Sequence, residues 1–221
     1  MTRAEREAWT YVVTDIEADG PWPGPNSMLS FASVAISLDG TERGSFEAVL
    51  EPLPGASPSP KTLEWFQHFP EAWEAATADP EPVPSVLARY AAWVRSLPHP
   101  RMFAAAPLAF DAAWVDYYLR RFTRYGITQG PYEDDPLFDG PGLCIRSYAA
   151  GVTGTSITEM HTHHIPPEWF GDVAHTHRAI DDARGYANLL LEMSRRADSR
   201  AQKPSRSSSP KPRADHPREP R

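Results

Sequence analysis

The stretch WTYVVTDIEADG, residues 9 to 20, contains the pattern from which the architecture of the chain follows. Its first eight residues are rich in β-branched and aromatic side chains, which is typical of a β-strand. Asp15 and Glu17 stand two residues apart at the end of this strand, so both side chains project from one face and can converge on one cation. The same spacing is also typical of a solvated strand face, so the pair alone leaves both interpretations open.

Strands and helices alternate along the rest of the chain. Further strands are expected at residues 28 to 38, 44 to 50 and 101 to 106. Helices are expected at residues 61 to 69, 71 to 78, 85 to 97, 110 to 122 and 177 to 195, with a less clear strand and helix near 143 to 150. Three strands in succession predict an antiparallel start, and the later alternation predicts an α/β or α+β fold with a mixed sheet.

The composition indicates one domain followed by a tail. A chain of 221 residues that is 41% hydrophobic can bury one substantial core, which we expect within residues 1 to 197. Arg, Lys, Ser and Pro dominate residues 198 to 221, which predicts a disordered basic tail. Cys144 is the only cysteine, and no apolar run has the length of a leader or a membrane span, so we expect a cytoplasmic protein with no membrane partner.

The charge of the chain is unevenly distributed. The formal net charge is -7, yet residues 200 to 221 contain seven Lys or Arg against two Asp or Glu, so the rest of the chain is strongly acidic. Dedicated nucleic-acid binders usually present a basic surface, because neutralised phosphates supply their non-specific affinity. The acidic domain argues against a tight grip on long duplexes and leaves short or single-stranded substrates at a metal site.

Two further carboxylates stand in otherwise apolar helices. Asp111 opens the helix that follows the strand at residues 101 to 106, and Asp182 lies one turn into the last helix. A buried carboxylate needs a partner, but a helix N-cap for Asp111 and a solvated face for Asp182 are the ordinary alternatives. His177 precedes Asp182 by five residues and can border the same cleft. Four other histidines compete for a special role: His161, His163, His164 and His175.

Three stretches carry a family resemblance: VVTDIEADG (12 to 20), AFDAAWVDYYL (109 to 119) and HTHRAIDDARGYANLL (175 to 190). Their order and spacing resemble the three motifs of the DEDDh branch of the DnaQ-like 3′-to-5′ exonucleases. The matching positions are Asp15, Glu17, Asp111, His177 and Asp182. The related tyrosine branch would need Tyr where this chain has Arg178, so the histidine branch fits. The sequence around the motifs is most similar to a bacterial subgroup described as exoribonuclease-like.

The resemblance implies an α/β fold of the RNase H-like type, with a mixed β-sheet flanked by α-helices. It also implies a 3′-to-5′ exonuclease that hydrolyses terminal phosphodiester bonds of single-stranded RNA or DNA, or of short oligonucleotides, to nucleoside 5′-monophosphates. Two divalent cations, Mg²⁺ or Mn²⁺, would be held by the four carboxylates, and His177 would take a proton from the attacking water. Many exonucleases of this kind are homodimers, so a homodimer is expected too.

The family recognises the 3′ end just after the first motif, which gives candidates for substrate contact with simple strand and turn packing as their ordinary alternative. These candidates are Asp19, Gly20, Met28 and Leu29. Trp22 and Phe110 are candidates for stacking on a base, because an aromatic ring can pack on any base face. This chain has Ala18 and Pro107 where family members commonly have Thr and, nearby, Asn, so its substrate contacts are expected to differ. The choice between RNA and DNA stays open.

Two other functions are compatible with parts of the sequence. The histidines of HTHH (161 to 164) and HTH (175 to 177) suit a transition metal, which would make the chain a histidine-ligated phosphohydrolase. The basic tail would suit a non-catalytic nucleic-acid-binding adaptor with an exonuclease-like fold. The phosphohydrolase is disfavoured because the sequence has no His-Asp dyad of the HD type and no His-Glu-x-x-His motif. The adaptor is disfavoured because it has no need for the ordered set of four carboxylates and His177.

Overall fold

The computed structural model describes residues 8–130, 134–161 and 164–201, and its centre is a five-stranded mixed sheet in the order β3-β2-β1-β4-β5. The strands are β1 (Thr10–Ala18), β2 (Met28–Ile36), β3 (Glu42–Val49), β4 (Arg101–Ala105) and β5 (Leu143–Cys144). β1, β2 and β3 pair antiparallel, whereas β4 is parallel to both β1 and β5. The expected antiparallel start and the mixed sheet are confirmed.

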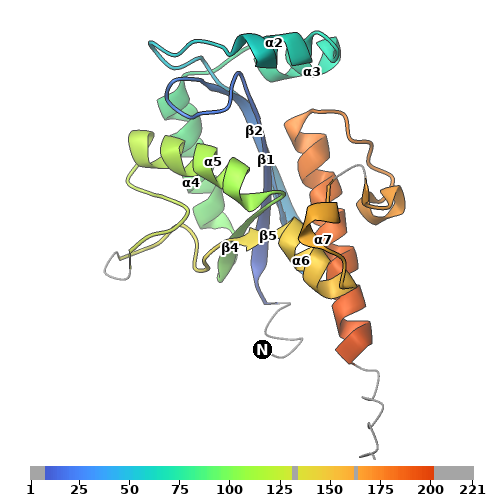
Figure 1. Cartoon of the computed structure of the whole chain (residues 1–221). Coiled ribbons are helices and arrows are strands. Elements are labelled where there is room, and N and C mark those ends of the chain that lie inside the picture. Colours follow the sequence, from blue (N-terminus) through green and yellow to red (C-terminus); the bar gives the residue numbers. More distant parts are fainter. Residues whose placement is uncertain (1–7, 131–133, 162–163, 202–221) are drawn as a thin grey trace, which may run out of the picture.

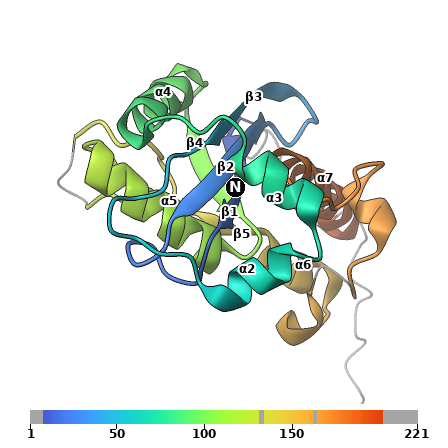
Figure 2. The same cartoon turned by 90° about the horizontal axis from the view of Figure 1, so that it is seen from above.

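Helices cover both faces of this sheet and one of its ends. They are α2 (Pro60–Phe66), α3 (Pro70–Thr77), α4 (Val83–Ser96), α5 (Leu108–Phe122), α6 (Ile145–Thr153) and α7 (Ala179–Ala201), with short 3-10 turns η1 (Ile157–Glu159) and η3 (Pro167–Phe170). α4 and α5 lie on one side of the sheet and α6 and α7 on the other (Figures 1 and 2). α2 and α3 lie across the end at which β1 finishes (Figure 1). The fold is therefore α/β.

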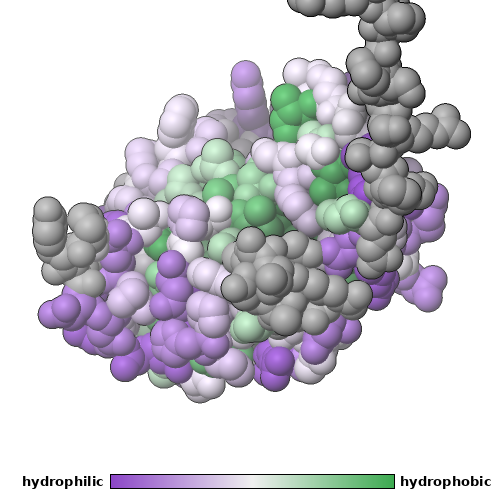
Figure 3. Space-filling model, turned by 90° about the horizontal axis from the view of Figure 1, so that it is seen from below, coloured by the Kyte–Doolittle hydropathy of each residue, from purple (hydrophilic) through white to green (hydrophobic). Residues whose placement is uncertain are grey.

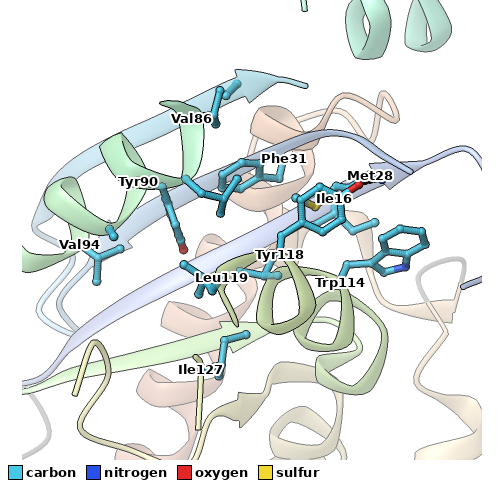
Figure 4. Close-up of a cluster of buried hydrophobic side chains, with 14 of the residues drawn as sticks. Ile16, Met28, Phe31, Val86, Tyr90, Val94, Trp114, Tyr118, Leu119 and Ile127 are labelled. Carbon is cyan, nitrogen blue, oxygen red and sulfur yellow. Dashed lines mark hydrogen bonds between the residues drawn. The ribbon is translucent and has the colours of Figure 1, made fainter. Parts of the chain in front are cut away.

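The alternation of side chains along β1 joins the two helical layers to one sheet. Val12 and Ile16 are buried in the core shared with α4 and α5, whereas Tyr11 and Val13 are buried in the core shared with α6 and α7. Figure 4 shows Ile16 within the first core, among side chains from β2, α4 and α5. Strand periodicity therefore directs every second residue of β1, including the position of Asp15, toward the α7 side.

The end of β1 is irregular. The pairing of β1 with β2 shifts register between Glu17 and Ala18, which is a bulge-like feature of the kind that re-aims side chains at the end of a strand. The chain then turns, and the Ser27 N–H donates to Asp19 Oδ1 over 2.6 Å. This turn fixes the end of β1 and the start of β2 relative to each other.

The last helix differs from its expected bounds at both ends. α7 begins at Ala179, and His177 lies before it with a left-handed φ of 57°, so the expected helical start at residue 177 is wrong. The helix continues to Ala201, beyond its expected end at residue 195. Residues 202 to 221 of the expected basic tail lie outside the described residues. A membrane-crossing helix is not found in the described ranges, because none of their helices is both long and apolar enough.

The end of the molecule opposite α2 and α3 shows a mixed surface. Hydrophilic side chains occupy much of its rim, and more hydrophobic ones gather toward its middle (Figure 3). The strand ends beneath α2 and α3 lie on the other side of the molecule (Figure 1). The carboxylates predicted from the sequence lie at the end of the sheet that α2 and α3 cover.

Candidate active site

Three carboxylates from two elements meet at the end of β1. Asp15 and Glu17 project from β1 and Asp182 from the first turn of α7, and their nearest oxygens lie within 4.8 Å of one another. Asp182 is buried, which excludes the solvated helix face as its explanation. Carboxylates at this separation repel one another unless protons or cations neutralise them. The expected convergence of Asp15 and Glu17 with Asp182 is thus present in the structure.

Asp111 approaches the same group from the other helical layer. It is the fourth residue of α5 and is 3% exposed, and Pro107 occupies the N-cap, so the N-cap alternative is wrong. The buried Oδ2 of Asp111 has no hydrogen-bond partner in the described part of the protein. Such an orphaned acceptor is costly in a folded protein and is often explained by an ion or water.

The site strongly perturbs the protonation of its carboxylates. Burial, followed by repulsion from neighbouring carboxylates, raises the pKa of Glu17 to about 8 and the pKa of Asp15 well above its ordinary value. Burial also raises the pKa of Asp111 to about 8, although backbone hydrogen bonds and Arg146 act in the opposite direction. At neutral pH this set therefore retains protons or attracts positive charge, which is the property expected of a site for divalent cations.

Two histidines flank Asp182. His175 Nδ1 lies 2.8 Å from Asp182 Oδ1, and the ring centroids of His175 and His177 are 4.5 Å apart. The backbone between them is also tied to Asp182, since the Thr176 N–H donates to Asp182 Oδ1 over 3.2 Å. The structure thus brings His177 to the carboxylates, as the family resemblance implies, and places His175 beside it.

An aromatic pair from the α2–α3 hairpin holds His177. The centroid of its ring lies 4.9 Å from that of Trp65 and 4.6 Å from that of Phe69, both in edge-on geometry. The two aromatic rings also contact each other, with centroids 4.8 Å apart. His177 is half-buried as a result, whereas His175 is exposed. Trp65 and Phe69 therefore limit the orientations open to the imidazole of His177.

Arg146 is a residue of the site that the sequence did not single out. It is the second residue of α6, and its positive charge lowers the pKa of both Asp15 and Asp111. Its Nη2 donates to the hydroxyl of Tyr186 on α7, one helical turn after Asp182, over 3.4 Å. The ambiguous pattern at residues 143 to 150 hid this position, because α6 follows a strand of only two residues.

The residues expected to contact substrate are mostly buried. Asp19 and Gly20 lie in the turn after β1, and Met28 and Leu29 begin β2 within the core. Phe110 differs, because its side chain is 43% exposed and it directly precedes Asp111. Trp22, which the sequence also offers for base stacking, is exposed in the turn between β1 and β2. Exposed aromatic side chains therefore include Phe110, next to Asp111 in the chain, and Trp65 and Phe69, which contact His177.

The other histidine cluster does not form a comparable site in the described residues. The rings of His161 and His164 lie 6.1 Å apart, but neither belongs to a metal-sized group of described residues. His163 lies outside the described residues. A cavity of about 310 Å³ instead opens beside the carboxylates, bordered by His175, Asp182 and Tyr186.

Comparison with known proteins identifies the fold through solved structures. No family model and no curated protein sequence matches the chain. The nuclease domain of 3′hExo, a DEDDh family member bound to rAMP, has a TM-score of 0.59 at 11% identity, over 88% of this chain and 94% of that one. These values establish the RNase H-like α/β fold of the DEDDh exonucleases, as expected.

Two further structures share this fold. Escherichia coli exonuclease I in complex with a dT13 oligonucleotide has a TM-score of 0.64 at 14% identity, covering 87% of this chain and 42% of that one. A 3′-exonuclease that recognises the 3′ end of a histone mRNA stem-loop has a TM-score of 0.60 at 11% identity, covering 86% and 82%. The chain thus spans less than half the length of exonuclease I. At sequence identities this low, the similarity shows a shared fold and no more.

Proposed function

We propose that this protein is a metal-dependent 3′-to-5′ exonuclease that releases nucleoside 5′-monophosphates from single-stranded nucleic acid or short oligonucleotides. The observation that carries the proposal is the meeting of Asp15, Glu17 and Asp182, with buried Asp111 beside them, at the strand ends of a DEDDh exonuclease fold. A purely structural cluster would not gather mutually repelling carboxylates whose pKa values are raised by burial.

The carboxylates fit a pair of divalent cations. Oxygen-only ligands favour hard ions, so Mg²⁺ or Mn²⁺ is preferred, and the unpartnered Oδ2 of Asp111 offers a further ligand atom. In this proposal Asp15, Glu17, Asp111 and Asp182 would hold the two ions through their carboxylate oxygens. When bound, such ions supply the positive charge that stabilises the phosphoryl transition state and activate water.

His177 is the proposed general base. An imidazole with an unperturbed pKa of about 6.5 can accept a proton near neutral pH. Trp65 and Phe69 contact the ring of His177, and its ligand atom lies within 4.8 Å of a ligand atom of Asp182, which favours His177 as the base. These contacts support the proposal, because a general base must lie close to the reacting group and keep a restrained orientation.

The substrate class follows from the surface around the carboxylates. Phe110 and the exposed faces of Trp65 and Phe69 offer aromatic rings on which unstacked bases can pack, which favours single strands over duplexes. A direct role for Asp19, Gly20, Met28 and Leu29 toward substrate stays a proposal, and their burial limits it to shaping the turn beside the 3′ end. The exoribonuclease-like subgroup, the homodimer and the cytoplasmic location also stay predictions.

The test is a panel of 5′-labelled single- and double-stranded RNA and DNA oligonucleotides, incubated with Mn²⁺ or Mg²⁺ and resolved as product ladders. The expected result is stepwise shortening from the 3′ end, abolished in Asp15→Asn and Asp182→Asn proteins whose circular dichroism is unchanged. Asp39→Asn is the control, because that carboxylate lies in an exposed turn. Internal cleavage would contradict the polarity, and full activity in either site variant would refute the assignment.

A further inference from the structure

The carboxylate site shares one of its residues with a second group of ligand atoms. His175, His177 and Asp182 each offer one ligand atom within 4.8 Å of the other two. We propose that these three residues form a site for a borderline transition-metal ion such as Zn²⁺, and that filling it switches the nuclease off. The proposed zinc binding depends only on these three residues, whereas the proposed inhibition by zinc rests on the proposed nuclease function.

The spacing of the three ligand atoms suits a small ion. A tetrahedral zinc ion holds its ligands at about 2.0–2.2 Å, which separates them from each other by about 3.3 Å. His175 Nδ1 and Asp182 Oδ1 are 2.8 Å apart, and no separation within the set exceeds 4.8 Å. Small side-chain rotations therefore bring all three atoms to bonding distance of one ion.

The chemistry of this group differs from that of the neighbouring carboxylates. Two imidazoles and one carboxylate favour zinc and similar ions, whereas Asp15 and Glu17 offer only oxygen and favour Mg²⁺ or Mn²⁺. Zn²⁺ also stands above Mn²⁺ in the general order of ligand affinity. Asp182 belongs to both groups, so an ion held by the histidines competes for it.

The surroundings restrain the proposed ligands without closing the site. Trp65 and Phe69 pack against the ring of His177, and the Thr176 N–H ties the backbone between the two histidines to Asp182. His175 is exposed, and the cavity of about 310 Å³ beside it leaves room for a water molecule as the fourth ligand. Three protein ligands and an open position are a usual zinc arrangement.

Zinc bound to His177 would also remove the proposed general base, which adds to the inhibition. An imidazole nitrogen that binds a metal cannot accept a proton from water, so zinc would occupy both the proposed base and one of the proposed carboxylate ligands. Inhibition at a low zinc concentration is therefore expected even when Mn²⁺ is in excess.

Binding is tested first on the metal-free, full-length protein. Zn²⁺ is titrated calorimetrically, and Co²⁺ is titrated with its visible absorption as a report of imidazole coordination. We expect one tight equivalent, with Kd raised by about tenfold or more in His175→Ala and His175→Gln. His164→Ala is the matched control, since His164 is an exposed histidine outside the group, and it should bind like the wild type. Unchanged binding in both His175 variants would overturn the proposal.

Inhibition is measured next, as the zinc concentration that halves the Mn²⁺-dependent rate, relative to the zinc-free rate of the same variant. This concentration should rise by about tenfold or more in the His175 variants, parallel to their loss of binding. Zinc binding that is lost in Asp15→Asn but kept in His175→Ala would place the ion among the carboxylates and overturn the proposal. Histidine-dependent binding in a protein without nuclease activity would support the metal site and reject the proposed function.

Discussion

His177 occupies a backbone conformation that non-glycine residues adopt only rarely. Its φ of 57° lies in the left-handed region, which costs a non-glycine residue of the order of 1 kcal/mol and persists only where the surroundings enforce it. The two aromatic contacts and the start of α7 two residues later provide that enforcement. The strain is consistent with a side chain held in position for chemistry.

Replacement of His177 tests its role as the base. His177→Ala should lower kcat by about 10²–10⁴-fold, because the positioned proton acceptor is lost, and should flatten the acidic limb of the pH–rate profile. His164→Ala should retain the profile of the wild type. A profile that changes in His175→Ala and not in His177→Ala would move the base to His175.

The positive charge of Arg146 is expected to support catalysis, and substitution of this residue tests that role. Arg146→Met should lower kcat/KM for oligonucleotides by about 10²-fold, because a cation beside Asp15 and Asp111 no longer offsets negative charge at the reacting phosphate. Arg146→Lys should recover part of the loss, since it keeps the charge but not the planar donor group. Arg184→Met is the control, because that arginine is exposed on α7. Equal kinetics for Arg146→Met and wild type would contradict this role.

The sequence predicted some residues of the site better than others. Strand periodicity placed Asp15 and Glu17 on one face, and Asp111 and Asp182 stood out as carboxylates in apolar helices. The family resemblance then joined these four residues with His177. Arg146 was missed because its position depends on the path of the chain between β4 and α6. The contacts that hold His177 were missed as well, because Trp65 and Phe69 are more than a hundred residues away in the chain.

At the level of elements, alternation and helical periodicity located the strands and helices, but not all of their ends. α7 was expected from residue 177, because no sequence signal marks the left-handed turn at His177. β5 was unclear, since a strand of two residues has no measurable alternation. Element ends depend on capping and tertiary contacts that periodicity does not contain.

Two glycines should respond to alanine in opposite ways. A Cβ at Gly20 would lie 2.2–2.5 Å from the side chain of Asn26, which cannot yield easily because it bonds to Ser57 O and to the Trp22 N–H. Gly20→Ala should therefore destabilise the protein by about 1–3 kcal/mol. Gly151 is exposed within α6 and a Cβ there meets nothing within 4 Å, so Gly151→Ala should stabilise by about 0.5–1 kcal/mol.

Urea unfolding monitored by circular dichroism measures both effects. Similar midpoints for the two alanine variants would contradict the turn geometry. The two variants together test two separate effects on stability: the space around each glycine, and the higher helix propensity of alanine.

At the scale of the whole molecule, the carboxylate site couples stability to pH and metal. The metal-free folded protein keeps Glu17 and Asp111 protonated up to about pH 8, whereas their ordinary pKa values are 4.5 and 3.8. The unfolded chain releases these protons first, so the stabilising effect is complete below about pH 4 and is lost as pH rises toward about 8. The Tm of metal-free protein should fall across this range.

Addition of Mn²⁺ at pH 8 should restore the Tm, because an ion that binds the folded state alone stabilises it. The double variant Asp15→Asn, Glu17→Gln should show a shallower pH dependence and a smaller response to Mn²⁺. Differential scanning fluorimetry from pH 5 to 8.5, with and without Mn²⁺, provides the measurement. A Tm of the metal-free wild type that rises across this range would contradict the raised pKa values.

The α2–α3 hairpin has its own small hydrophobic cluster, separate from the two cores on the sheet faces. This cluster consists of Leu29, Phe66, Ala72 and Ala76, with Trp73 packed against it. Elements anchored by little buried apolar surface open at a lower free energy than the global fold. Because this hairpin also carries Trp65 and Phe69, each local opening would release the ring of His177. The protein would then alternate between two populations. In one, the α2–α3 hairpin is docked and the imidazole of His177 is oriented, and in the other the hairpin is undocked and the carboxylates are accessible.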